Sequence, residues 1–250
     1  MTLKMILEIA LTNFFSLNEK VTLDLQAANL QTKEARALAD NTFTVGNERL
    51  LKTVAIYGAN ASGKSNIIKA IKASVDMILQ SHNFNEGDSF GFKPFKFGST
   101  DAPSEFYIRF LLDGIEHEYS FSCTRNEVIT ESLYHYPKGR KALIFSRDER
   151  KEGGKKDKYE FTTVIRRPLD VANNTSRKTL FISRASQMDR EKAKEVYRWF
   201  NEQLVFSYRG KTTIAIDRFL GDNKDAVLRV LKAADSDIVE FSFKDGELTT

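Results

Sequence analysis

The stretch from residue 51 to residue 80 constrains the fold more than any other part of the chain. Its centre, GANASGKS at residues 58–65, fits the phosphate-loop pattern of a glycine, four further residues and then Gly-Lys-Ser. Before it, the apolar run VAIY at residues 54–57 predicts a buried strand. After it, apolar residues recur at helical spacing as far as Leu79, which predicts a helix. The sequence therefore predicts the strand, loop and helix that this motif requires.

The residue types of the loop suit the binding of ATP and Mg²⁺. Gly58 permits a turn that a side chain would obstruct, and Gly63 lets the backbone approach a phosphate closely. Backbone amides of the loop and of the new helix point at an anion. Lys64 can reach the β and γ phosphates as the catalytic cation, and the Ser65 hydroxyl can hold Mg²⁺. The residues expected to contact the nucleotide are Gly58, Ala59, Asn60, Ala61, Ser62, Gly63, Lys64, Ser65 and Asn66. The alternative is a glycine-rich turn before an ordinary amphipathic helix.

Length and composition bound the possible architectures. The chain has 250 residues, of which 41% are hydrophobic, enough for one large domain or two small ones. The net charge of +4 permits nucleic acid as a partner without arguing strongly for it. Cys123 is the single cysteine, so no internal disulfide can form, and His82, His117 and His135 show no metal-ligand spacing. No apolar run approaches the ~18 residues of a membrane span. The N-terminus does not look like a secretion signal, so we expect a soluble cytoplasmic protein without a membrane partner.

Hydrophobic periodicity divides the chain into three parts. We expect N-terminal strands and the phosphate-loop unit in residues 1–80, an antiparallel β-rich part in residues 81–183, and a helical segment with a final strand in residues 184–250. Asp113-Gly114, between two alternating runs, predicts a tight hairpin turn. His117 falls on the apolar side of one run and is expected to be a hydrogen-bonded core residue. The expected strands are 3–11, 20–25, three within 105–136, 141–146, 158–165, 179–183 and 238–243, and the expected helices are 32–39, 67–79, 186–204 and 223–234.

Two segments carry basic residues that allow contact with nucleic acid. FKPFKF, residues 92–97, could stack bases on its phenylalanines, but its period-two pattern favours an extended strand that packs on the next sheet. RDERKEGGKKDK, residues 147–158, could meet a nucleic-acid backbone. Because this second segment mixes both charge signs around two glycines, a solvated turn explains it equally well. DNA therefore stays open as a partner.

Several pieces of the chain resemble known ATPases. ALTNFFSLNEKVTLDL at residues 10–25 and AIYGANASGKSNIIKAI at residues 55–71 resemble the ABC-type ATPase heads of the RecF and SMC group, in which an asparagine at the position of Asn60 is typical. Later pieces are similar to a bacterial branch, the AAA-type ATPases of phage-defence systems of the PtuA and RloA kind. These pieces are FKPF at 92–95, PSEFYIRF at 103–110, ITESLYHY at 129–136, LFISRASQ at 180–187 and LKAADSDIVEFSF at 231–243.

The resemblance implies a fold and a set of partners. It implies an α/β P-loop NTPase head of ABC type with an antiparallel β subdomain, and self-association of two heads that sandwich ATP. It would place Asn13 to Ser16 near the nucleotide, with Phe15 where many relatives have an arginine. Gln187 could be the glutamine that senses Mg²⁺ and the attacking water, or a surface residue that caps the following helix.

Three motifs of such heads are missing from the sequence: a signature loop, a strand that ends in Asp-Glu, and a switch histidine. Residues 213–217, TIAID, imitate the acidic strand, but Arg218 stands where the catalytic glutamate belongs. The resemblance therefore implies an incomplete head, which we expect to bind ATP better than it hydrolyses ATP.

Three functions remain open from the sequence. The first is an ATPase module whose ATP-driven dimerisation switches an effector, such as a nuclease or another defence protein, in phage defence. The second is a DNA-maintenance clamp of the RecF or SMC type. The third is a non-hydrolysing interaction module with a structural nucleotide.

Overall fold

The computed structural model describes residues 4–28, 32–33, 39–46, 48–91, 93–99, 102–208, 211–212, 224–233, 242–244 and 247–249. The chain divides into two compact units, Met1–Gln203 and Leu204–Thr250. The first unit contains the phosphate loop. It is a mixed α/β structure with a mainly antiparallel sheet, which confirms the predicted fold class.

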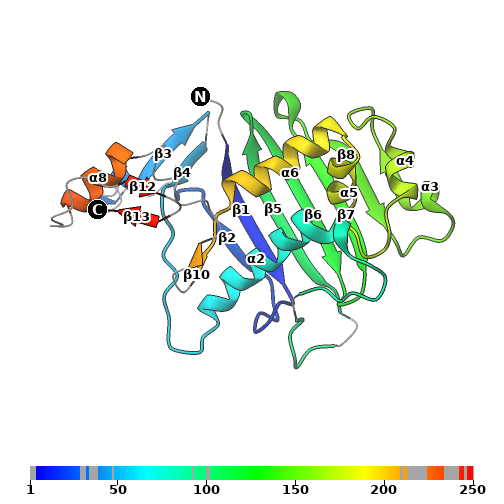
Figure 1. Ribbon diagram of the computed structural model, residues 1–250, viewed down its shortest axis with the longest axis horizontal. Helices are drawn as coiled ribbons and strands as arrows, with labels where there is room; N and C mark the ends of the chain where they lie inside the picture. The colour runs from blue at the N-terminus through cyan, green and yellow to red at the C-terminus, as the bar shows by residue number, and fades with distance from the viewer. Residues whose placement is uncertain are drawn as a thin grey trace. The chain divides into compact units, whose positions relative to one another are not determined.

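Seven antiparallel strands form the main sheet of the first unit, in the order β2-β1-β5-β6-β7-β8-β9 (Figure 1). Asp113 and Gly114 both have left-handed φ angles, 54° and 77°, which gives the tight turn that joins β5 to β6. The strands predicted at 3–11, 20–25, within 105–136 and at 141–146 are confirmed. The strand bounds are β1 Met5–Thr12, β2 Val21–Asp24, β5 Ser104–Leu112, β6 Ile115–Cys123, β7 Val128–His135, β8 Ala142–Asp148 and β9 Tyr159–Phe161.

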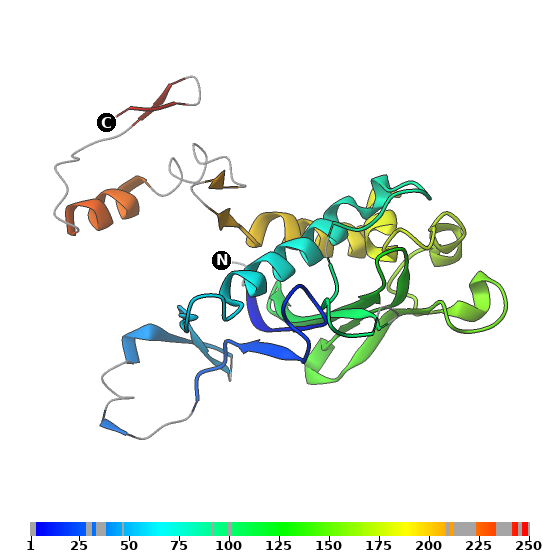
Figure 2. The same cartoon turned by 90° about the horizontal axis from the view of Figure 1, so that it is seen from below.

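Three helices, α2 (Lys64–Gln80), α5 (Phe181–Gln187) and α6 (Glu191–Gln203), lie on one side of this sheet. Figure 2 shows α2 in cyan and α6 in gold on the same side. The core between helices and sheet is aromatic: the ring centroids of Phe110 and Trp199 are 4.3 Å apart, and Phe200 packs beside both. His117 is fully buried in this core, where its Nδ1 lies 2.9 Å from the Ile115 carbonyl, as predicted.

Shorter elements complete the first unit. The hairpin of β3 (Thr42–Val45) and β4 (Glu48–Leu51) forms a separate two-stranded sheet that the periodicity did not predict. The small helices are α3 Lys155–Lys158, α4 Pro168–Asn173, and the 3-10 turns Ala39–Asn41, Ser81–Asn83 and Pro137–Gly139.

The second unit is small. Helix α8 (Lys224–Ala233) confirms the helix predicted at 223–234. Its strands pair as the hairpins β10 (Ser207–Tyr208) with β11 (Lys211–Thr212) and β12 (Ser242–Lys244) with β13 (Glu247–Thr249). Most of the strand predicted at 238–243, and most of the helix predicted at 32–39, lie outside the described residues. Across the described ranges of both units, every helix is too short or too polar to cross a membrane.

Two predicted strands are wrong. Residues 54–57 are not in a strand, and Val54, Ile56 and Tyr57 are 43%, 36% and 92% exposed. A strand inside a parallel sheet is buried by neighbours on both sides, and no strand of the described residues pairs with this run. Residues 181–187, which overlap the strand predicted at 179–183, form helix α5 instead.

Three further predictions need correction. FKPFKF forms no strand over the described residues 93–97, so the strand is wrong there. Phe97 is 84% exposed and does not pack as expected, whereas Phe95 is half-buried. The strand predicted at 158–165 is shorter, because β9 ends at Phe161. The helix predicted at 186–204 is interrupted before α6, since Asp189 takes a left-handed φ of 59° that breaks the helical path.

Candidate functional site

The phosphate loop lies where the sequence predicts it, directly before α2. Its backbone turns through left-handed φ angles at Ala61 (64°) and Gly63 (95°). Ser62 N donates to the Ala59 carbonyl at 3.3 Å, and Asn66 N donates to the Gly63 carbonyl at 2.8 Å as the helix begins. The loop is therefore a closed turn that leads directly into the first turn of α2.

Gly63 is required at its position for two reasons. Its φ of 95° is unfavourable for any residue with a side chain, and a Cβ there would lie 2.8 Å from the Ser16 hydroxyl. The same hydroxyl accepts a hydrogen bond from Asn66 Nδ2 at 2.8 Å. The structure thus places Ser16, in the turn that the resemblance puts near the nucleotide, in contact with the loop.

That turn is itself held firmly. Asn13 Nδ2 donates to the Ala102 carbonyl at 2.8 Å, and Asn13 Oδ1 accepts from Phe95 N at 2.8 Å. Phe14 is fully buried and exchanges backbone hydrogen bonds with Leu17. The Ser16 hydroxyl is therefore presented to the loop from a fixed support.

Lys64 lies over the loop that precedes it. Its Nζ donates to the carbonyls of Gly58 and Ala59, both at 2.7 Å. A cavity of about 170 Å³ lies at this point, lined by Ala61, Ser62, Gly63, Lys64, Ser65 and Asn66. The ammonium group is at the cavity but is bonded to protein oxygens, so it must turn away from them to reach a bound anion.

The residues of this cavity fit a phosphate group and Mg²⁺. They supply backbone amides at a helix start, one cation and the exposed hydroxyl of Ser65. None of the residues that line the cavity is a carboxylate. The described part of the site therefore supplies binding groups for a phosphate, and no group that orients an attacking water.

Gln187 is not part of this site. It is exposed at the end of α5, where its Oε1 accepts a hydrogen bond from Arg184. Arg184 also donates to the carbonyl of His82, just past the last residue of α2, at 3.3 Å. The 17 residues of α2 span about 25 Å, so Gln187 lies near the opposite end of that helix from the loop. The role of Mg²⁺ sensor is wrong for this residue, and residues 213–218, which imitate the acidic strand, lie outside the described residues.

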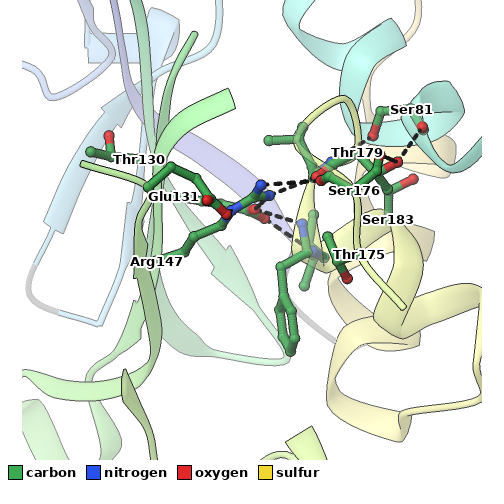
Figure 3. Close-up of polar contacts among 12 residues, drawn as sticks. Ser81, Thr130, Glu131, Arg147, Thr175, Ser176, Thr179 and Ser183 are labelled. Carbon is green, nitrogen blue, oxygen red and sulfur yellow. Dashed lines mark hydrogen bonds and ion pairs between the residues drawn. The ribbon is translucent and has the colours of Figure 1, made fainter. Parts of the chain in front are cut away.

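The far end of α2 is fixed by a polar network (Figure 3). Ser81, directly after α2, accepts a hydrogen bond at its hydroxyl from Leu180 N and another at its carbonyl from the Thr179 hydroxyl, both at 3.0 Å. The Ser183 hydroxyl lies 2.9 Å from His82 Nδ1. Helix α5 and the segment before it therefore hold the helix that carries the phosphate loop.

Glu131 on β7 holds the start of α5 in turn. It is fully buried and accepts hydrogen bonds from the Tyr119 hydroxyl (2.9 Å) and from the backbone amides of Phe181 (2.5 Å) and Ile182 (2.9 Å). Burial raises the pKa of Glu131, and the charge of Arg147 and these three donors oppose the shift. Sequence reasoning missed this residue, although a carboxylate on the buried side of a strand is a signal that could have found it.

The comparisons with known proteins agree with this geometry. The family model described as "AAA domain, putative AbiEii toxin, Type IV TA system" matches residues 54–246, well over half of the chain. The chain belongs to this AAA family. It is therefore a P-loop ATPase module of AAA type, which confirms that part of the resemblance. A search of curated proteins found no match.

Proposed function

We propose that this chain binds ATP with Mg²⁺ through residues 58–66, and that ATP-dependent association of two such chains switches an effector protein in phage defence. The observation that carries the proposal is the closed loop with Gly63 and Lys64 at the start of α2. Membership of the AAA family supports nucleotide binding in general. The words "toxin" and "TA system" in the family description, together with the resemblance to phage-defence ATPases, support the defence role.

Each loop residue has a distinct task in this proposal. The backbone amides of the loop and of the first turn of α2 hold the phosphates. Lys64 leaves the Gly58 and Ala59 carbonyls and takes a phosphate oxygen as its new partner, so an ion pair with the phosphate replaces two hydrogen bonds to uncharged carbonyls. Ser65 offers its hydroxyl to Mg²⁺, which when bound would neutralise charge on the phosphates.

The same residues explain why we expect binding without efficient turnover. Phosphoryl transfer requires a group that orients the attacking water in addition to charge neutralisation. No residue that lines the described cavity is a carboxylate or a histidine. We therefore expect the chain alone to hold Mg-ATP and to hydrolyse it slowly.

Isothermal titration calorimetry with Mg-ATP tests the binding step. Lys64→Ala should weaken binding strongly, because it removes the cation at the cavity. Lys52→Ala is a matched control, since Lys52 is an exposed lysine close in sequence that does not line the cavity. Equal affinities for the Lys64 variant and the wild type would refute the assignment of the loop.

A second set of measurements separates the functions. Sedimentation with and without Mg-ATP tests association: a monomer in both conditions would contradict the ATP-sandwiched dimer. DNA-stimulated ATP turnover would favour the DNA-maintenance clamp. ATP binding without turnover or association would favour a non-hydrolysing module.

A further inference from the structure

A second charged cavity lies far from the phosphate loop. It has a volume of about 390 Å³ and is lined by Arg166, Arg167, Asp189, Arg190 and Glu191. Arg166 and Arg167 precede α4, Asp189 and Arg190 join α5 to α6, and Glu191 begins α6; α4 packs against α5. Because α5 contacts the end of α2 opposite to the loop, this cavity and the phosphate loop are separate sites.

The carboxylates around this cavity already have cationic partners. Asp189 and Glu191 lie 3.3 Å and 3.7 Å from Lys194 Nζ. Asp170 pairs with Arg190 Nη2 at 3.0 Å. Each of these carboxylates thus has a cationic partner, and Asp189 and Glu191 share one.

Arg166 and Arg167 are different. Both are exposed, and neither makes a hydrogen bond or ion pair within the part of the chain that the structure describes. Arg167 also holds a left-handed φ of 50°, as does Asp189 across the cavity with 59°. Such backbone strain in residues other than glycine is concentrated at functional sites.

In the basic hairpin tip, by contrast, three of the cations pair with one carboxylate of the protein. Arg147 is fully buried and pairs with Glu149 at 2.8 Å. Lys155 and Lys158 lie 3.6 Å and 3.2 Å from the same carboxylate. Lys151 and Lys156 of the tip remain exposed, but they do not line this cavity, whereas Arg166 and Arg167 do.

We propose that Arg166 and Arg167 form a phosphate-binding pocket for the backbone of a nucleic acid. Guanidinium groups match phosphate oxygens in a bidentate geometry, and adjacent exposed arginines suit a polymer with repeated phosphates. The inference is independent of ATP binding at the phosphate loop, since it uses other residues at another place.

The test is the affinity of the full chain for a fluorescein-labelled DNA duplex, measured by anisotropy at several salt concentrations. Arg166→Gln with Arg167→Gln removes two charges from the pocket. Lys151→Gln with Lys156→Gln removes two exposed charges from the hairpin tip and is the matched control. Lys64→Ala should leave DNA binding unchanged, which separates this site from the phosphate loop.

The plot of the log association constant against log salt has a negative slope, and the pocket variant should make that slope less steep by about 1.8. It should also raise the Kd at 100 mM salt by a factor on the order of 50. The control variant should match the wild type. No DNA binding by the wild type, an unchanged pocket variant, or equal losses in both variants would each overturn the proposal. Binding of inorganic phosphate alone, seen by phosphorus NMR without DNA binding, would overturn it in favour of a small anion.

Discussion

Replacing Glu131 by leucine should destabilise the first unit strongly. Leucine is close to glutamate in size but accepts no hydrogen bonds, so the Tyr119 hydroxyl and the amides of Phe181 and Ile182 would lose their acceptor in a fully buried place. Arg147, whose Nη1 lies 3.9 Å from the Glu131 carboxylate, would lose one of its two carboxylate neighbours. The change therefore leaves three buried neutral donors without an acceptor and the Arg147 guanidinium with one carboxylate neighbour in place of two.

The magnitude follows from these contacts. Each buried donor without a partner costs about 1–3 kcal/mol, and removal of one partner from a buried ion pair costs about 3–5 kcal/mol. Since relaxation of the start of α5 recovers part of this, we expect Glu131→Leu to lower the free energy of unfolding by roughly 3–5 kcal/mol. Tyr119→Phe removes only one of the three donors and should cost about 1 kcal/mol.

Trp199 makes the assay direct. It is the single tryptophan of the chain and is fully buried in the first unit, so its fluorescence in urea reports the unfolding of that unit alone. Hydrogen exchange at the Phe181 and Ile182 amides should accelerate in the leucine variant before global unfolding. If Glu131→Leu unfolds within about 1 kcal/mol of the wild type, the claim that this carboxylate holds α5 is refuted.

Three further predictions concern the loop, the core and the hairpin tip. Gly63→Ala should weaken Mg-ATP binding about tenfold in calorimetry, because a left-handed alanine costs about 1–2 kcal/mol and its Cβ would collide with the Ser16 hydroxyl. If that collision contributes, adding Ser16→Ala should recover part of the lost affinity. Burial, with a smaller effect of a nearby lysine, lowers the pKa of His117 to about 4. The unfolded state therefore binds the His117 proton first as the pH falls from 6.5 to 4, and this residue should lower stability by up to about 3 kcal/mol in urea titrations. His117→Phe should remove this contribution, while His82 and His135, whose pKa values are also lowered by burial, keep theirs. Glutamate at both Lys155 and Lys156 should lower stability, since the first pairs with a buried carboxylate, and should leave DNA binding unchanged; weaker binding would return the hairpin tip to the candidate sites.

The antiparallel part of the fold could be predicted because its information is local. In β5 and β6 every second residue is apolar apart from His117, and Asp113-Gly114 has the composition of a two-residue turn. The phosphate loop could be predicted for the same reason, since its glycines and Lys64 occupy fixed spacings. The ranges of these strands, the turn between them and the position of the loop required no knowledge of distant residues.

Helix α5 could not be predicted in this way. The run TLFIS is rich in β-branched and aromatic residues, which favour a strand. The amides that begin the helix are bonded to Glu131, which lies about fifty residues earlier on β7. A tertiary hydrogen bond therefore outweighs local propensity, and no spacing in the sequence shows that the two segments meet.

The contact between the loop and its support has the same character. Ser16 and Asn66 are fifty residues apart, yet their hydrogen bond joins the N-terminal turn to the first turn of α2. The resemblance indicated the proximity of this turn to the nucleotide, whereas periodicity alone could not.

The exposed run at 54–57 shows what the phosphate loop does and does not need. The left-handed angles at Ala61 and Gly63, and the bonds of Lys64 to the loop carbonyls, form although no described strand pairs with the run before them. The loop is supported instead from α2 and from the turn that ends at Leu17. Strand pairing at 54–57 would add apolar burial beside the loop, so it would contribute stability to the site without being the source of the loop's shape.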